Sequence, residues 1–367
     1  MWPGLTKRRC GIAAWIALLA GVLGASACTS LSYYGQAVSG HLDLMSKRRE
    51  LGQVMAAEDT PPELRARLGD LASMRDFAVS DLGLPDNGSY RLYADVERPY
   101  LVWNVFAAPE LSLQPKEWCF LVVGCVTYRG YFNQADANRM VAALGTEGYE
   151  TWAGGVPAYS TLGWFDDPLL NTFVHWSRGR VAELMFHELA HQRLYIADDT
   201  AFNESFATAV GQLGAERWLA MFGRSDEGLA YRRERARREA FIELMSGTRQ
   251  VLETTYAAAI DDDEKRARKQ AALSQAQSAY ADWKRRWDDF DGFDPVMATG
   301  PNNAWFVALS AYHRWVPAFR RLFELSGESL PRFYEQVQAL SELDQLARDA
   351  RLKALSGDAQ SLLADLR

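Results

Sequence analysis

Cysteine and histidine are both scarce in this sequence, with four and five residues in a chain of 367. Cys10 and Cys28 lie in an apolar N-terminal segment, which leaves only Cys119 and Cys125 in the body of the chain. No histidine lies near this pair, which argues against a zinc site built on cysteine. In an oxidising compartment such a close pair predicts a short-loop disulfide, and two buried free thiols are the alternative.

Basic residues are outnumbered by acidic ones, 40 to 47, which gives a formal charge of −7. Removing residues 1–27 takes away three basic residues and no acidic one, so the charge falls by three to −10. An excess of negative charge excludes nucleic-acid binding through bulk charge. Internal repeats and long linkers are also absent. The composition, 48% hydrophobic with 12 Trp, predicts a globular protein with one large or two modest cores.

Long apolar runs are confined to the N-terminus, which reads as a targeting segment. Lys7, Arg8 and Arg9 precede an apolar stretch over residues 11–24, and Ala-Ser-Ala-Cys follows at residues 25–28. This ending fits a lipoprotein signal that makes Cys28 the first, lipidated residue. It also fits an ordinary signal peptidase site that cuts the same bond, and a single uncleaved membrane anchor is the remaining alternative. The first two readings predict export from the cytoplasm.

Residues 186–192, Phe-His-Glu-Leu-Ala-His-Gln, contain a His-Glu-x-x-His motif in a segment predicted to be helical. On a helix, His187 and His191 lie on one face and can direct two imidazoles to one metal ion. Glu188 lies beside them, placed to reach a metal-bound water. Zn²⁺ lowers the pKa of such a water to about 7, and the carboxylate takes its proton as the water attacks a carbonyl. The motif therefore predicts zinc-dependent hydrolysis.

The alternative to a metal site is a polar cluster satisfied within the core. Val181, Leu184, Met185, Leu189 and Ala190 make the segment apolar, so we expect a buried helix. Two histidines and a glutamate on a buried helix need partners, and a metal ion supplies them.

A catalytic zinc usually keeps three protein ligands and one open position. Leu194 and Ala197 stand where a longer His-Glu-x-x-His-x-x-Gly-x-x-His motif needs Gly and His, so the third ligand is a carboxylate or a distant histidine. Glu204 is our prediction, because it falls in the first turns of a second helix. Asp198 and Asp199 are the alternatives, although they resemble a turn and an N-cap. Small residues on this helix, Ala201, Ala207 and Ala209, favour its close approach to the first helix. Glu183, one turn before His187, is a candidate partner for an imidazole.

Other segments predict scaffold. We expect helices over residues 32–56, from Pro61–Pro62 to about residue 80, and over residues 134–144. Strand-like runs occupy residues 89–132 and 149–152. Residues 226–290 predict two long, charged helices joined by a turn at residues 260–263. A further helix starts at residue 301 and continues to residue 323 with a kink at Pro317. The predicted fold class is thus α+β, mainly α-helical, with a small β-sheet and long helical hairpins.

The chain resembles a predicted bacterial aminopeptidase family of envelope lipoproteins. The resemblance lies in the His-Glu-x-x-His segment and, beyond it, in residues 33–37, 124–132, 154–165, 167–168 and 202–208. It implies a glutamate-type zincin peptidase that binds Zn²⁺ through His187, His191 and Glu204, with Glu188 as the general base. It also favours lipidation at Cys28, hence a lipid-anchored protein of the outer membrane that faces the periplasm.

Four further residues are candidates for substrate contact. In zincin peptidases a strand before the metal helix pairs with the substrate backbone, and we expect residues 158–164 to do so, with Tyr159 and Trp164 in the cleft. A later helix often supplies an oxyanion donor, for which Tyr312 and His313 are candidates. A core aromatic is the alternative for Tyr159, Trp164 and Tyr312, and a surface histidine is the alternative for His313.

The predicted domains are a signal peptide (1–27), an N-terminal helical scaffold (28–88), a zincin-like catalytic core (89–222) and a C-terminal helical region (223–367). The predicted function is peptide-bond hydrolysis, by an aminopeptidase according to the resemblance. Well-known zinc aminopeptidases of this type carry a Gly-x-Met-x-Asn stretch with an acidic residue that holds the substrate's free amine. Residues 154–158 hold no carboxylate there, although Asp166 or Asp167 can substitute. An endopeptidase, and a non-catalytic lipoprotein that uses the scaffold for binding, are the alternatives.

Overall fold

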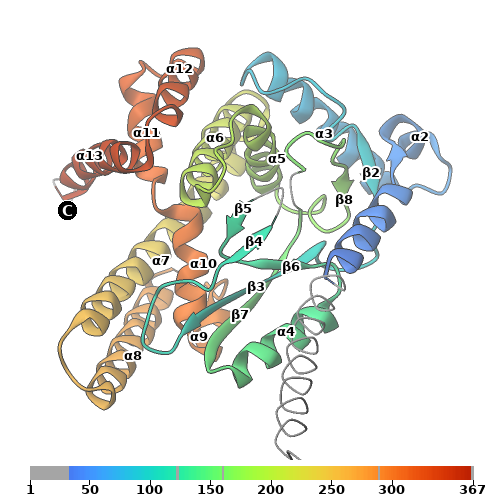
Figure 1. The fold of residues 1–367 in the computed structure, drawn as a ribbon. Coiled ribbons are helices and arrows are strands. Elements are labelled where there is room, and N and C mark those ends of the chain that lie inside the picture. The colour runs from blue at the N-terminus through green and yellow to red at the C-terminus, as the bar shows by residue number, and fades with distance from the viewer. Residues whose placement is uncertain (1–32, 121–123, 159–160, 288–289, 365–367) are drawn as a thin grey trace, which may run out of the picture.

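The computed structural model describes residues 33–120, 124–158, 161–287 and 290–364. The chain is mainly helical with small β-sheets (Figure 1), in agreement with the predicted class. Residues 33–46 form a first helix, called here the N-terminal helix. The elements that follow in the chain are β1 (Arg49–Glu50), α2 (Leu51–Ala56), α3 (Pro62–Ser80), β2 (Leu92–Ala94), β3 (Val102–Pro109), β4 (Trp118–Phe120), β5 (Gly124–Val126), β6 (Arg129–Tyr131), α4 (Gln134–Thr146), β7 (Tyr149–Val156), β8 (Leu169–Leu170), α5 (Arg178–Arg193), α6 (Thr200–Phe222), α7 (Ser225–Ala257), α8 (Asp262–Arg286), α9 (Asp294–Thr299), α10 (Asn303–His313), α11 (Val316–Leu325), α12 (Leu330–Ser341) and α13 (Gln345–Ala364).

The largest pairing of strands joins β3 to β7. These strands run antiparallel from Val102↔Val156 to Pro109↔Tyr149, and β6 pairs with the other edge of β3. Helix α4 contacts β3 and β7, and α10 contacts the same two strands (Figure 1). Seven of the eight residues of β3 are consequently buried, so this strand lacks the alternating pattern of a half-exposed one. The strand predicted at residues 149–152 is thus confirmed and continues to Val156.

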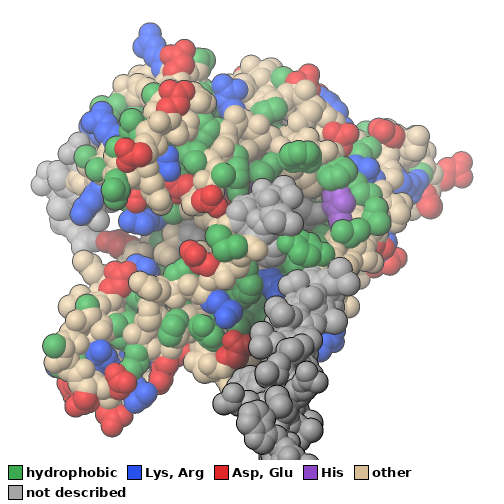
Figure 2. Space-filling model, in the orientation of Figure 1, with side chains coloured by type: hydrophobic (Ala, Val, Ile, Leu, Met, Phe, Trp, Pro, Cys, Tyr) green, Lys and Arg blue, Asp and Glu red, His purple; other side chains and the backbone are tan. Residues whose placement is uncertain are grey.

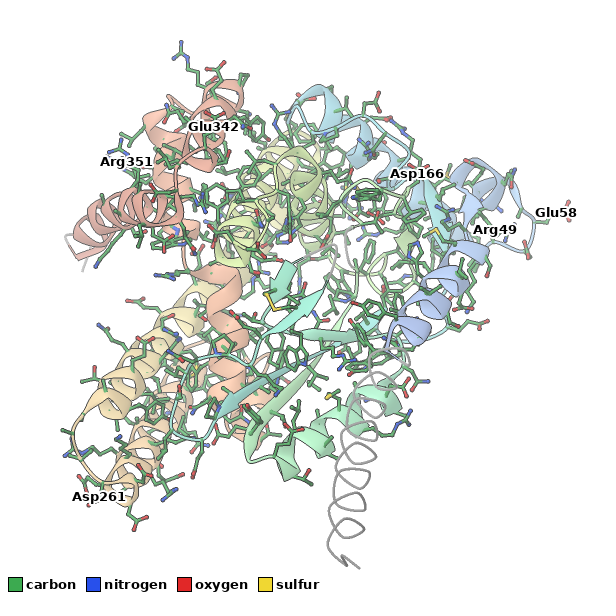
Figure 3. All side chains as sticks on the ribbon, viewed as in Figure 1. Arg49, Glu58, Asp166, Asp261, Glu342 and Arg351 are labelled. Atoms are coloured by element: carbon green, nitrogen blue, oxygen red, sulfur yellow. A yellow bond between two sulfur atoms is a disulfide. The ribbon has the colours of Figure 1, made fainter. Side chains whose placement is uncertain are left out.

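The two smaller sheets tie distant segments together. Strand β2 pairs antiparallel with β1 and parallel with β8. Strands β4 and β5 form a hairpin in which Cys119 and Cys125 face one another and are joined by a disulfide, visible as a yellow bond in Figure 3. The sheets and hairpin lie beside the packed helices α5 and α6 (Figure 1).

One large hydrophobic core joins the N-terminal helices, the α5–α6 pair and α11 to α13. A second core lies beneath the α7–α8 hairpin and includes Phe241, Met245, Tyr280 and Trp305. The predicted charged hairpin is confirmed, and Asp261 lies at its tip (Figure 3), where its carboxylate accepts a hydrogen bond from Glu264 N at 2.8 Å and caps α8. The first core therefore extends across three of the predicted sequence regions.

Two predicted helices are interrupted. The helix predicted over residues 32–56 ends at residue 46, because Arg49 and Glu50 pair with β2 before α2 begins. The helix predicted from residue 301 to 323 is not kinked at Pro317 but divided into α10 and α11. Pro317 has no N–H to donate and occupies the first turn of α11, where it disturbs no helical bond. Trp315 N donates to Ser205 Oγ at 3.0 Å in the gap.

The prediction of a substrate-binding strand over residues 158–164 is wrong for the residues that the structure describes. Strand β7 ends at Val156, and Thr161 to Trp164 form a tight turn that is closed by Trp164 N donating to Thr161 O at 3.1 Å. Leu162 and Gly163 both have positive φ angles, 55° and 79°, which an extended strand cannot accommodate. Residues 159 and 160 lie outside the described residues.

The predicted signal peptide and Cys28 also lie outside the described residues. Within the described part of the chain, no helix is both long enough and apolar enough to cross a bilayer.

Candidate metal centre

Helix α5 carries the His-Glu-x-x-His motif through the main core. Six of its residues are fully buried: Val181, Ala182, Met185, Phe186, Leu189 and Ala190. Glu188 and His191 are buried with them, and His187 is half-buried. The one-turn spacing places His187 Nε2 and His191 Nε2 3.1 Å apart.

Helix α6 brings Glu204 to the same place. Its start is fixed by Asp199, whose carboxylate accepts from Phe202 N at 3.1 Å as an N-cap. Asn203 folds the connection between the helices, because its side chain donates to Ile196 O at 2.7 Å and accepts from Ile196 N at 2.9 Å. Asp198 instead accepts from Cys125 N at 3.1 Å and attaches the disulfide hairpin. Neither aspartate joins the metal-type cluster, which consists of His187, His191 and Glu204.

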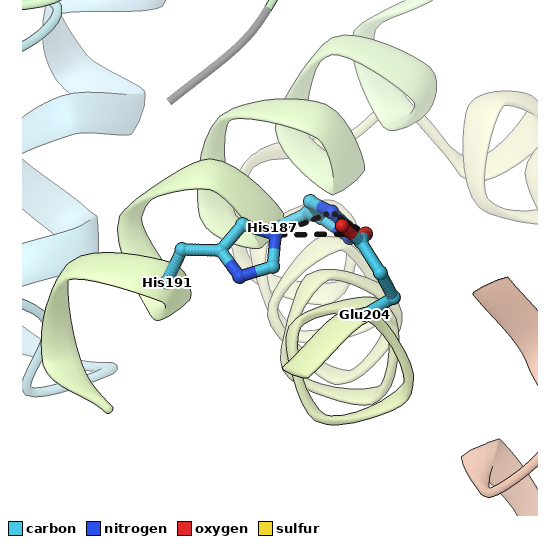
Figure 4. A group of neighbouring side chains, drawn as sticks. All are labelled: His187, His191 and Glu204. Atoms are coloured by element: carbon cyan, nitrogen blue, oxygen red, sulfur yellow. Dashed lines mark hydrogen bonds and ion pairs between the residues drawn. The ribbon is translucent and has the colours of Figure 1, made fainter. Parts of the chain in front are cut away.

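The three side chains converge from the two helices, as Figure 4 shows. Glu204 Oε2 lies 3.3 Å from His187 Nε2 and 3.6 Å from His191 Nε2. In a tetrahedral zinc site with bonds of about 2.0–2.1 Å, ligand atoms lie about 3.3 Å from one another. The chain therefore presents one oxygen and two nitrogens at the separations, and with the donor types, that such an ion requires. His191 Nδ1 is a buried nitrogen without a hydrogen-bond partner in the described structure.

Glycine on α6 permits the close approach of the two helices. A Cβ at Gly211 would lie 2.5 Å from Glu183 O and 3.2 Å from His187 Cβ, and one at Gly214 would lie 2.6 Å from the Phe186 ring. Ala207 and Ala209 are fully buried in the same helix. The small residues at the crossing thus include two glycines that we did not single out in the sequence.

The second nitrogen of His187 faces α6. His187 Nδ1 lies 3.4 Å from Thr208 Oγ1. Glu183, our candidate for an imidazole partner, is bound instead by the Tyr231 hydroxyl at 3.1 Å and by Arg238 Nη2 at 2.6 Å. Thr208 therefore occupies the position beside the imidazole that we had expected Glu183 to occupy.

The pKa values of the two glutamates in the cluster are shifted in opposite directions. Burial raises the pKa of Glu188, and the nearby histidines offset only part of this rise. Burial would also raise the pKa of Glu204, but the charges and hydrogen bonds of His191 and His187 together hold this pKa well below its usual range. Glu204 is thus suited to remain an anionic ligand, whereas Glu188 is suited to exchange a proton.

A polar network around the buried Asp167 and Ser89 lies close enough to Glu188 for its charge to act on Asp167. Asp167 Oδ2 accepts from Thr161 N at 3.0 Å, and the Gln192 amide lies 3.5 Å from the same oxygen. Gln192 also donates to Ser89 Oγ at 3.1 Å and accepts from Asn87 Nδ2 at 2.7 Å. Burial raises the pKa of Asp167 to about 7. Gln192, which follows His191, thus connects α5 to the turn after β7.

Three aromatic hydroxyl groups approach the cluster. Burial, followed by the charges of Glu188 and Asp167, raises the pKa of Tyr90, whose hydroxyl is buried without a hydrogen-bond partner in the described structure. Burial and the charge of Glu204 raise the pKa of both Tyr128 and Tyr195. The Tyr195 ring centroid lies 6.5 Å from that of His191. All three phenols therefore stay protonated at neutral pH and can donate hydrogen bonds.

The candidate substrate residues have different positions. His313 ends α10 half-buried, and burial lowers its pKa to about 4 with smaller effects from Arg238, Glu183, His187 and Glu204. It therefore lies near the cluster and is not the surface histidine that we weighed as the alternative. Trp164 is 78% exposed on the turn after β7. Tyr312 belongs to α10, but its side chain is outside the described part, as is all of Tyr159.

Several residues around the cluster had no local signal in the sequence. Tyr90, Tyr128 and Thr208 are ordinary core residue types, and no spacing relates them to the motif. Arg348 of α13 binds the N-cap Asp199 through Nε at 2.9 Å and Nη2 at 2.7 Å, with both side chains buried. Only Gln192 adjoins the motif, directly after His191.

A family model described as "Putative aminopeptidase" matches residues 32–352, which is most of the chain. The match begins just before the N-terminal helix, ends in α13, and includes every residue of the cluster. Comparison with the curated proteins and with the solved structures gave no match.

Proposed function

The chain belongs to this aminopeptidase family, and from that premise we propose that it is a zinc-dependent metallopeptidase with a zincin-like core. The single observation that carries the proposal is the convergence of His187, His191 and Glu204, with ligand atoms 3.1 to 3.6 Å apart and Glu188 buried beside them. A polar cluster satisfied within the core is the alternative, but it gives the buried Glu188 no task.

The proposed chemistry is hydrolysis of a peptide bond. A zinc ion, when bound, would acidify a water molecule and polarise the scissile carbonyl. Glu188 takes the proton of the attacking water and returns it to the leaving amine. Its raised pKa supports the first transfer, because a carboxylate with a higher pKa is a stronger base, and it lets Glu188 hold the proton until the leaving amine accepts it.

Charge that develops on the substrate carbonyl oxygen requires hydrogen-bond donors. We assign this role to His313 or Tyr312 of α10, with Tyr128 as a third candidate. Trp164, in the turn after β7, and Tyr159, which lies outside the described residues, are proposed to contact the substrate. The phenol of Tyr128 stays protonated because its pKa is raised, which suits a donor.

The family description favours an aminopeptidase over an endopeptidase. One observation favours the endopeptidase. Asp167 is 4% exposed and already accepts a hydrogen bond from Thr161, so this carboxyl is poorly placed to hold a substrate's free amine. Asp166 is exposed (Figure 3) and remains a candidate for that role.

We further propose that the protein acts in the bacterial cell envelope, anchored to the outer membrane by lipid at Cys28 and facing the periplasm. The charged and apolar N-terminal segment that ends in Ala-Ser-Ala-Cys supports export. Its partners would then be peptides or proteins of the envelope and the membrane, and no nucleic acid.

Two glutamates on neighbouring helices test the mechanism with the same chemical change. Elemental analysis and hydrolysis of a mixed peptide library are measured for the chain from residue 29 onward and for Glu188→Gln, Glu204→Gln and the exposed control Glu342→Gln. We expect about one zinc per chain in the parent, in Glu188→Gln and in the control. Turnover should fall by at least about 10²- to 10⁴-fold in Glu188→Gln, and Glu204→Gln should lose both zinc and turnover.

The outcomes separate the alternatives. Cuts confined to the N-terminal residue support the aminopeptidase, and internal cuts support the endopeptidase. Zinc in the parent without turnover indicates a binding scaffold. Zinc-free parent protein, or unchanged cleavage by Glu188→Gln, contradicts the proposed mechanism.

A further inference from the structure

The exposed face of the N-terminal helix carries almost no charge. Its outward positions are Tyr34, Gly35, Val38, Ser39, Leu42 and Ser46. Val38 is 59% exposed and Leu42 is 61% exposed, and with Tyr34 they follow one another at four-residue spacing along the helix. The solvent face of an ordinary surface helix carries charged and polar residues, so this face is suited to an apolar neighbour.

The turn after β7 extends the same face. The ring centroids of His41 and Phe165 lie 4.6 Å apart, and Arg48 Nη1 donates to Asp166 O at 3.0 Å. Phe165 is 50% exposed, and Trp164 next to it is 78% exposed. We call Tyr34, Val38, Leu42 and Phe165 the apolar face. Figure 2 shows hydrophobic side chains gathered on this side of the molecule, whereas red and blue side chains are interspersed over the α7–α8 hairpin.

The inner side of the N-terminal helix is firmly attached. Gln36 accepts from Phe132 N at 3.1 Å and donates to Gly130 O at 3.3 Å, which fixes the helix to β6. Leu44 is buried in the main core. A Cβ at Gly40 would lie 2.2 Å from the Phe132 ring. The apolar face is therefore presented on a rigid support and does not belong to a loose segment.

We propose that the apolar face lies in the interface of a lipid bilayer, as a second membrane contact beside the anchor expected at Cys28. Residue 33 lies five positions after Cys28, and a fully extended chain spans at most about 18 Å over five positions. A lipid at Cys28 thus holds the helix within that distance of the membrane surface. Helices of this kind lie in the interface with their apolar side chains about 5–10 Å deep.

Charge beside the apolar face fits anionic headgroups. Lys47, Arg48 and Arg49 follow one another directly after the helix, in a chain with an acidic balance. Arg49 is exposed and is labelled in Figure 3 beside α2. Acidic groups nearby are Glu50, which follows Arg49 and is exposed, Asp43, which pairs with Lys47 at 3.3 Å, and Asp166, which is exposed. The proposal concerns docking and does not depend on the peptidase assignment.

The test uses the chain from residue 29 onward, which lacks the lipid and keeps all four hydrophobic cores, because these cores lie between residues 33 and 355. Cosedimentation is measured with vesicles of phosphatidylethanolamine and phosphatidylglycerol. We expect the parent to bind, and Val38→Glu with Leu42→Glu to lower the partition coefficient by at least about tenfold.

The matched control is Leu229→Glu with Val251→Glu on α7. These side chains are of the same two types and are 60% and 52% exposed. The control should bind vesicles as the parent does. A polarity-sensitive dye supplies a second readout. On Ser39→Cys, within the helix's outward face, it should shift to the blue with vesicles, whereas on Ser274→Cys of α8 it should not.

Four results would overturn the proposal. The parent fails to bind vesicles, the control pair weakens binding as much as the helix pair, or Val38→Glu with Leu42→Glu lowers peptide hydrolysis without vesicles, which would make the face part of the substrate cleft. The fourth is a dimer in sedimentation that the same pair dissociates, which would make the face a contact between two copies. Thermal melting of each variant confirms that it is folded.

Discussion

Two helix pairs in this protein solve different problems. In the α5–α6 pair, polar side chains occupy core positions, among them Glu188, His191, Asn203, Ser205, Thr208 and Gln212. In the α7–α8 hairpin the core is apolar and aromatic, and charges lie on the solvent face in pairs such as Glu264 and Arg268, with the buried Lys269 as an exception. The first pair gives up apolar burial to hold a site, whereas the second is built in the usual amphipathic way.

The two helix pairs also differ in how closely their helices pack. Glycine at positions 211 and 214 lets α6 approach α5 until their backbones nearly touch. Helices α7 and α8 pack through large side chains, including Phe241, Met245 and Tyr280. The convergence of three side chains needs closely packed helices, because His187 and Glu204 are short side chains on different helices. Substitutions of one chemical kind should therefore act differently in the two pairs.

Substitution of one arginine in each helix environment should give the largest difference in the free energy of unfolding. Arg348→Met leaves Asp199 buried without its cation, so we expect the free energy of unfolding to fall by about 3–5 kcal/mol. The N-cap of α6 lies five residues before Glu204, so zinc affinity should also fall, by about tenfold or more. Arg268→Met removes a pair that is about half exposed (52% and 49%) on α8, and should cost at most about 0.5 kcal/mol.

Urea unfolding and competition with a chelator measure these two quantities. Equal losses of stability in the two variants would contradict the comparison. Unchanged zinc affinity in Arg348→Met would limit the ion pair to a role in stability.

Glycine-to-alanine substitutions in the two pairs should change the free energy of unfolding with opposite signs. Gly211→Ala forces a Cβ against Glu183 O, and we expect a loss of roughly 1–3 kcal/mol together with weaker zinc binding. Gly247→Ala, within α7, meets no atom within 4 Å and should gain about 0.5–1 kcal/mol, because alanine favours the helix. Thermal melts of both variants test the pair. Stabilisation by Gly211→Ala would show that the helices have room to separate.

The smallest difference should appear in the pH dependence of stability. Asp167 has a pKa of about 7 in the folded chain against an ordinary value of 3.8. The folded state therefore holds its proton more tightly, so the contribution of Asp167 to stability is fully present below about pH 4 and is lost as pH rises to 7. We expect the parent to lose roughly 1–2 kcal/mol from pH 5 to pH 7 relative to Asp167→Asn.

Asp294, which packs against α8, should show the reverse sign. The hydrogen bonds of Lys284 and Tyr280 lower its pKa. Its contribution is present above the unfolded pKa and is lost as pH falls through the folded value, so the parent should exceed Asp294→Asn in stability only at the higher pH. Urea titrations from pH 3 to 8 with excess chelator give both difference curves. Parallel curves for the two variants would contradict the assigned environments.

Much of the fold was predictable because its signals are local. The helix start at Pro62, the turn at Asp261 and the charged hairpin follow from residues within one or two turns of each other. The N-cap role of Asp199 is local in the same sense. One error occurred where a distant segment competes, because pairing of Arg49 with Tyr93 interrupts a helical pattern. The other was local, because the turn at residues 161–164, with positive φ at Leu162 and Gly163, replaces a predicted strand.

The sequence by itself determined the reactive group. Residues four apart on a helix share a face whatever surrounds them, so His187 and His191 had to lie together. Glu204 follows in the next helix, five positions after its N-cap Asp199. Only the tertiary structure decided the environment of that group. Asn87 and Gln192 are 105 positions apart, and Asp199 and Arg348 are 149 apart. Such contacts depend on the packing of the whole core, because no local period relates residues at these separations.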